Sequence, residues 1–182
     1  MQKSLGMLEL ISIPTGIEAG DMMLKTASVD LVAAQSICAG KYIVIVTGEV
    51  SAVNASIKAG KQSAGMKLID SLVIPNVDRQ VPIAINACTA VSNIQALGAM
   101  ETYSLCAAVL AADTAVKAAE IELIEIRLGR GLGGKSFITM TGDIAAVREA
   151  VATAAARQEV QGLMSDSVVI PAPHLEIVKS LL

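Results

Sequence analysis

The sequence contains few of the residues on which nucleic-acid binding and acid–base catalysis depend. Aromatic residues make up 2% of its 182 residues, and tryptophan is absent. Aspartate and glutamate (17) outnumber lysine and arginine (14), so the net charge is −3. We expect no nucleic-acid partner, because such binding needs a basic surface and often aromatic platforms for the bases. His174 is the only histidine, and no nucleophile–base pair can be placed, so we also expect no enzymatic activity.

Long apolar segments are also missing. The longest uncharged run, Gln80–Met100, is interrupted by polar side chains, and no stretch would comfortably span about 30 Å of hydrocarbon. The N-terminal residues include no long apolar region of the kind that a signal peptide has. We therefore expect a cytoplasmic protein that does not contact a membrane.

Cysteine is scarce and irregularly placed. The three cysteines, Cys38, Cys88 and Cys106, are odd in number, and none forms a C-x-x-C motif. This pattern excludes a disulfide framework or a zinc site within one chain, and it suits a reducing compartment. Cys88 and Cys106 are interpreted as small apolar side chains with a packing role.

Aliphatic residues, by contrast, are abundant. Hydrophobic residues make up 53% of the chain, and the mean hydropathy is +0.61. A disordered chain is excluded, because there is ample apolar surface to bury. An apolar surface this large on a small protein predicts that contacts between subunits bury part of it.

The most informative feature is an internal duplication with a period of about 90–95 residues. Three pairs of segments carry the match: Leu5–Ile13 with Leu97–Leu105, Gly40–Val53 with Gly134–Val147, and Ser71–Pro75 with Ser167–Pro171. The two copies join near Cys88–Gln95. We therefore predict two domains of the same fold, at residues 1–91 and 92–182.

Each copy shows the same order of elements. The first copy predicts a strand at Leu5–Ser12, a helix opened by a Thr15-x-x-Glu18 capping box, paired strands at Val29–Ser36 and Lys41–Thr47, and a helix at Val50–Ala64. A strand ending at Pro75 and a short helix follow. The second copy predicts strands at Leu97–Ser104, Ile121–Leu128 and Lys135–Thr141, a helix at Ile144–Ala156 and a strand ending at Pro171. The fold class is α/β, an α+β sandwich in which helices pack on a mostly antiparallel sheet.

Both copies carry an acid–base pair on the first helix. Asp21 precedes Lys25 by four residues, and Asp113 precedes Lys117 by the same spacing. Such pairs usually lie on a solvated face and contribute a few tenths of a kcal/mol. Their recurrence also favours an interface role for the two lysines.

A glycine-rich segment resembles a nucleotide-binding loop. Residues Gly129–Ser136 fit the pattern G-x-x-x-x-G-K-[ST], in which glycine amides and the lysine bind phosphate at the start of a helix. Here the following residues are β-branched and predict a strand. The first copy has Gly40-Lys41 at the same place without the other glycines. A P-loop is therefore a minor alternative, and the glycines are interpreted as allowing a tight turn and close packing against another chain.

Taken together, these motifs resemble the bacterial microcompartment shell domain. They are Leu-Gly-x-x-Glu in the first strand, Asp-x-x-x-Lys on the first helix, Gly-Lys before a strand that ends in Thr-Gly, and Val-Ile-Pro near the end of each copy. The order resembles the non-permuted tandem class. The resemblance implies a homotrimer that mimics a hexamer, has a pore on its axis, and tiles with other shell proteins in the shell of an organelle.

Within that family, Ser36–Lys41 is similar to the pore loop of the PduT-type shell proteins. The resemblance implies that Cys38 from three subunits binds one [4Fe-4S] cluster, with a non-protein ligand on the fourth iron. The cluster would transfer electrons, or be relayed, across the shell, and the resemblance implies a redox enzyme in the lumen as its partner. One cysteine per chain suits this site, because three thiolates meet on a threefold axis and soft thiolates suit iron–sulfur chemistry.

The resemblance also implies two further sets of site residues. The predicted pore-lining residues are Ser36, Ile37, Ala39, Gly40, Arg130, Gly131, Leu132 and Gly133. The predicted tile-edge residues are Lys25, Lys117, Arg79 and His174. The alternative left open is a shell tile whose pore conducts metabolites and holds no cluster.

Overall fold

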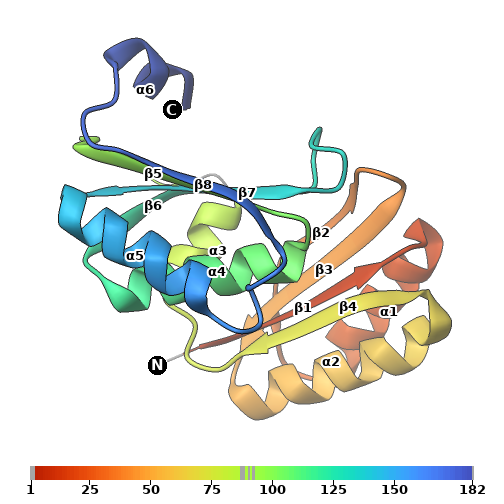
Figure 1. The fold of residues 1–182 in the computed structure, drawn as a ribbon. Coiled ribbons are helices and arrows are strands. Elements are labelled where there is room, and N and C mark those ends of the chain that lie inside the picture. The colour runs from red at the N-terminus through yellow and green to blue at the C-terminus, as the bar shows by residue number, and fades with distance from the viewer. Residues whose placement is uncertain (1–2, 87–88, 90, 92, 182) are drawn as a thin grey trace. The chain divides into compact units, whose positions relative to one another are not determined.

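The duplicated sequence folds twice into the same pattern of strands and helices in the computed structural model, which describes residues 3–86, 89, 91 and 93–181 (Figure 1). Two compact units result. Unit 1 comprises Met1–Val77 together with the loop Arg130–Gly134, and unit 2 comprises Asp78–Gly129 and Lys135–Leu182. Each unit therefore takes a short segment from the other copy of the sequence.

Unit 1 is a four-stranded antiparallel sheet with the strand order β2-β3-β1-β4. Its elements are β1 (Ser4–Leu10), α1 (Ile13–Thr26), β2 (Asp30–Ile37), β3 (Lys41–Gly48), α2 (Val50–Ala64), a short 3-10 turn (Gly65–Lys67) and β4 (Leu68–Ile74). The helices α1 and α2 pack on each other and on the sheet. Aliphatic side chains of β1, β3 and both helices form the core, among them Leu8, Leu10, Met23, Val44, Val46, Val53 and Ile57.

Unit 2 repeats this topology with the strand order β6-β7-β5-β8. Its elements are α3 (Gln80–Ile85), β5 (Ala96–Thr102), α4 (Leu105–Ala118), β6 (Ile121–Leu128), β7 (Ser136–Gly142), α5 (Ile144–Ala156), β8 (Met164–Ile170) and α6 (Leu175–Leu181). No helix in the described ranges is long and apolar enough to cross a bilayer.

The strand registers of the two sheets agree in detail. A bulge interrupts β2 between Leu31 and Ala33, and the equivalent bulge interrupts β6 between Leu123 and Glu125. The predicted fold class is confirmed, as are the limits predicted for α2, α5 and β6. Conserved irregularities of this kind make the residue-by-residue equivalence between the copies secure, and the later arguments depend on it.

Two local features differ from the sequence-based expectation. The helix α1 starts at Ile13, and the hydroxyl of Ser12 caps it by accepting the Thr15 amide at 3.4 Å, so the predicted Thr15–Glu18 capping box is wrong. Proline at the first turn suits this earlier start, because the amide it lacks would have no helical partner. Separately, the segment from Asp78 onward groups with unit 2, upstream of the domain limit predicted at residue 91.

Candidate pore-loop site

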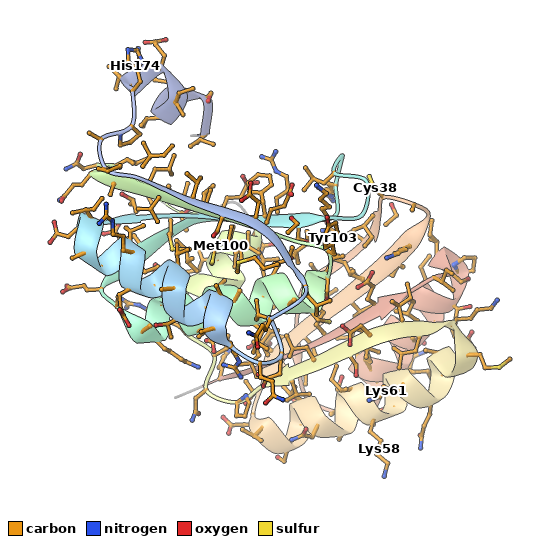
Figure 2. The ribbon with its side chains drawn as sticks, in the orientation of Figure 1. Cys38, Lys58, Lys61, Met100, Tyr103 and His174 are labelled. Carbon is orange, nitrogen blue, oxygen red and sulfur yellow. The ribbon has the colours of Figure 1, made fainter. Side chains whose placement is uncertain are left out.

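The β2–β3 hairpin of unit 1 carries Cys38 at its tip (Figure 2). Strand β2 ends at Ile37 and β3 begins at Lys41, so three residues make the turn. Ala39 (φ 62°) and Gly40 (φ 70°) both adopt the left-handed conformation. This conformation costs a residue with a Cβ roughly 1 kcal/mol, so Ala39 stores strain beside the cysteine. The Cys38 side chain itself is half-buried.

The loop Arg130–Gly134 belongs to the same unit and is built on glycine. Gly131, Gly133 and Gly134 have φ values of 70°, 61° and 91°. A Cβ added at any of the three would meet no atom within 4 Å. Within this chain, the glycines are therefore required for backbone conformation rather than for close packing.

The structure brings Cys38 and this loop together. The Gly131 amide donates a hydrogen bond to the Cys38 Sγ at 3.0 Å, and the Arg130 guanidinium donates to the side-chain carbonyl of Gln35. The Gly131 N–H is thus directed at the sulfur atom, which is the atom through which a cysteine binds metal.

The other predicted pore residues divide into two groups. Ser36, Ala39, Gly40, Arg130, Gly131 and Gly133 are exposed, and Leu132 is half-buried. Ile37 is a correction, because its side chain is buried in the unit 1 core and cannot line an opening. Its alternation with the exposed Ser36 along β2 explains the burial.

Within the described part of the chain, no metal-binding cluster forms around Cys38. Among the described residues, no three His, Cys, Asp or Glu side chains come close enough to hold one ion. Cys106 is buried on α4, as predicted for a packing role. Cys88 lies outside the described residues. Judged by the described residues, a metal site at Cys38 would draw its further ligands from other chains.

The lysine of the glycine-rich motif has a structural partner. Lys135 donates to the Glu101 carboxylate at 2.9 Å, and Lys41 of unit 1 donates to Glu9 at 2.8 Å. Strand β7, not a helix, follows the glycine loop. Lys135 is thus bonded to Glu101, and no helix N-terminus follows the loop to bind a phosphate, so the geometry is not that of a P-loop. Sequence reasoning missed these ion pairs, although Glu9 and Glu101 recur in step with the two lysines.

In the ion pair between Lys135 and Glu101, each residue shifts the pKa of the other toward the charged form. The hydrogen bond from Lys135, with a second from the Ser165 hydroxyl at 2.7 Å, lowers the pKa of Glu101 below its ordinary value of 4.5. The same hydrogen bond from the other side raises the pKa of Lys135 above 10.5. Both groups are therefore charged across the neutral range.

The predicted tile-edge residues lie at exposed positions. Lys25 on α1 pairs with Asp21 at 2.5 Å, and Lys117 on α4 pairs with Asp113 at 2.6 Å. Arg79 precedes α3 and His174 precedes α6, and both are exposed. We expected both aspartates to lie on a solvated helix face. Asp21 does, but the Asp113 side chain is only 2% exposed. This buried carboxylate also accepts the Asp78 amide at 2.9 Å, so its two oxygens bond to different partners.

Comparisons with known proteins agree with the duplicated fold. The family model described as the BMC domain matches residues 4–77 and again residues 96–173. The bacterial microcompartment shell protein PduT of Citrobacter freundii is 42% identical over 174 residues, which are 96% of this chain and 95% of its own. The carboxysome shell protein CcmK2 of Synechococcus elongatus is 45% identical over 64 residues, which are 35% of this chain and 63% of its own.

A solved structure matches over almost the whole length. The crystal structure of a microcompartment protein from Desulfitobacterium hafniense superposes with a TM-score of 0.94 at 46% identity, covering 98% of this chain and 99% of that one. A fused permuted hexameric shell protein from the RMM microcompartment superposes with a TM-score of 0.61 at 22% identity, covering 84% of this chain and 81% of its own. At that identity, the second match supports the fold alone.

Proposed function

Because the chain belongs to the BMC domain family and is a bacterial microcompartment shell protein of the PduT type, we propose that three copies form one shell tile. In this tile, the three Cys38 thiolates bind a single [4Fe-4S] cluster at the central pore. The observation that carries the proposal is the placement of Cys38 at an exposed hairpin tip, with the Gly131 amide directed at its sulfur.

The apolar surface of unit 1 supports the trimer. Four large aliphatic side chains of α1 and β2 are exposed in the single chain: Ile17, Met22, Leu24 and Leu31. Helix α4, which is the repeat of α1, has ten buried residues out of fourteen. Ile17 and Leu31 correspond to Val109 and Leu123, which are buried in the second copy, so the exposure of these two residues favours contact with a further subunit.

The residues of the pore loop suit a cluster. Cys38 supplies one thiolate per chain, so a threefold axis supplies three and leaves one iron for a non-protein ligand. The Gly131 amide holds the sulfur in place, and hydrogen bonds to cluster sulfurs raise the reduction potential. Arg130 adds positive charge beside an anionic cluster. When bound, the cluster accepts and donates one electron, which would connect the two sides of the shell and a redox enzyme in the lumen.

The test is an anaerobic preparation of the whole protein. Iron and acid-labile sulfide are quantified, and an EPR spectrum is recorded after reduction. We expect four irons per three chains, loss of iron and signal in Cys38→Ser, and full retention in Cys106→Ala, the buried-cysteine control. Iron retained equally in Cys38→Ser would overturn the assignment. A trimer that binds no iron in any preparation would instead favour a pore that conducts metabolites.

The proposed edge residues extend the same model to the shell. Lys25, Lys117, Arg79 and His174 would contact neighbouring tiles, because their side-chain nitrogen atoms at exposed edges can reach the carbonyls and carboxylates of the next tile. Charge removal at Lys25 and Lys117 is expected to abolish sheets seen by electron microscopy while the trimer remains. Sheets of normal size from the double alanine variant would contradict the edge assignment.

A further inference from the structure

Helix α3 follows the last strand of the first copy but packs on the edge strand of the second. Its Gln80 side chain donates to the Ile121 carbonyl at 3.2 Å and accepts the Leu123 amide at 2.9 Å. Val81 and Ala84 of the same helix are fully buried. The amide of Asp78, just before the helix, donates to Asp113 on α4. The segment Asp78–Ile85 at the end of the first copy therefore packs on β6 and α4 of the second copy, and we call this set of contacts the α3 clasp.

Helix α6 holds the equivalent place after the second copy and begins with the same local geometry. Asp78 caps α3 by accepting the Gln80 amide at 2.9 Å, and His174 caps α6 by accepting the Glu176 amide through Nδ1 at 3.2 Å. The next backbone bond also repeats, from Val81 to the Asp78 carbonyl and from Ile177 to the His174 carbonyl. Yet α6 has no buried residue, and Ile177, the equivalent of Val81, is 52% exposed.

The surface that would receive α6 is open in the same chain. Strand β2 is the edge strand that corresponds to β6, and its Leu31 is 49% exposed where Leu123 is 1% exposed. Leu31 pairs with Val46 in the same register as Leu123 with Met140, so its amide points away from the sheet as the Leu123 amide does. Asp21, the equivalent of Asp113, is likewise exposed.

We propose that His174–Leu181 of one chain docks on the β2 edge and α1 of a second copy of this chain, as α3 docks on β6 and α4. The His174 amide donates to Asp21 of the second copy, Glu176 accepts the Leu31 amide, and Ile177 covers Leu31. This inference rests on the trimer of the proposed function, because a closed ring offers one such edge to each α6. It gives the C-terminal helix a role in closing that ring.

The proposed contact of α6 with β2 of the second copy should be weaker than the α3 clasp within one chain, because the residues that make the hydrogen bonds differ. The Gln80 amide both donates and accepts, whereas the Glu176 carboxylate only accepts. The carbonyl of Val29, which corresponds to that of Ile121, would therefore lack a donor and face a negative charge. Replacing Glu176 by Gln should restore the second hydrogen bond and tighten the trimer by about threefold, while Glu176→Ala should loosen it by a similar factor.

Cross-linking of the full-length chain tests the contact directly. All variants carry Cys38→Ser, Cys88→Ser and Cys106→Ala, so that engineered cysteines react alone. Chains with Asp30→Cys are mixed with chains carrying Glu176→Cys and treated with a short bifunctional maleimide. The matched control is one chain with Glu122→Cys and Gln80→Cys, the equivalent positions of the α3 clasp, which should cross-link within itself.

The expected result is a covalent dimer from the mixture and none from either single variant alone. A chain with both Asp30→Cys and Glu176→Cys that cross-links only within itself would overturn the inference. A trimer in sedimentation that gives no cross-link, or that responds equally to Glu176→Gln and Glu176→Ala, would overturn the proposed contact of α6 and leave the trimer standing. A monomer in sedimentation would overturn the trimer itself.

Discussion

Glu9 in the first copy and Glu101 in the second occupy the same place in their sheets, and each pairs with the lysine that follows the pore loop. The Glu9 side chain is only 3% exposed, whereas that of Glu101 is 35% exposed and has a second partner in Ser165. The duplicated backbone therefore preserves the pair but not its environment. Because burial determines what an ion pair contributes, equal geometry at the two sites predicts unequal energetics.

The helix–sheet contacts differ in a second way, through compensating changes in size. In unit 1, Gly16 of α1 packs against the Tyr42 ring, where an added Cβ would come within 2.5 Å of the ring. The equivalent residues of unit 2 are Ala108 and Ser136, a larger helix residue against a smaller strand residue. At this helix–strand position, unit 1 therefore has the smaller residue on the helix and the larger one on the strand, and unit 2 has the reverse.

Replacing the lysine of each ion pair should give the largest difference in stability between the two copies. Lys41→Ala leaves the buried Glu9 carboxylate without its cation, and we expect a loss of about 3 kcal/mol in the free energy of unfolding. Lys135→Ala should have a much smaller effect, because Glu101 keeps water and Ser165 as partners. Urea denaturation followed by far-ultraviolet circular dichroism measures both. Equal losses in the two variants would contradict the role given to burial.

Packing at Gly16 should give the next largest effect. The added methyl of Gly16→Ala meets a rigid ring, so we expect a loss of roughly 2 kcal/mol. Combining it with Tyr42→Ser recreates the unit 2 arrangement. The double variant should therefore lose less stability than the sum of the two single changes. Additive losses in the same urea assay would show that the size exchange is incidental, and Ala108→Gly provides the reciprocal control.

The pH dependence of the second pair should give the smallest effect. The lowered pKa of Glu101 means that its contribution is present above about pH 4.5 and is lost as the pH falls through the folded-state pKa. The raised pKa of Lys135 means that its contribution is present below about pH 10.5 and is lost as the pH rises through the folded-state pKa. Carboxyl NMR titration in Lys135→Met should show the pKa of Glu101 moving back toward 4.5. An unchanged pKa would contradict the assigned cause.

The sequence by itself determined the secondary structure and the duplication. Apolar periodicity placed α2, α5 and β6 at their observed limits, and the repeated motifs predicted two copies of one fold. Local patterns are sufficient to predict these elements, because the spacing of apolar residues along a strand or helix identifies the face that it buries. Cys38 was singled out on other grounds, because its loop position beside Gly40 gained meaning only from the resemblance of Ser36–Lys41 to the pore loop of PduT-type shell proteins.

Tertiary structure alone decided which of two equivalent residues is buried and where each connecting segment packs. Asp21 and Asp113 have the same spacing to a lysine, but the Asp78 amide reaches only Asp113. Helix α3 follows the first copy in sequence yet packs with the second, and the Arg130–Gly134 loop groups with unit 1 through the contact of Gly131 with Cys38. Such contacts join residues 35 to 93 positions apart, and no local periodicity records them.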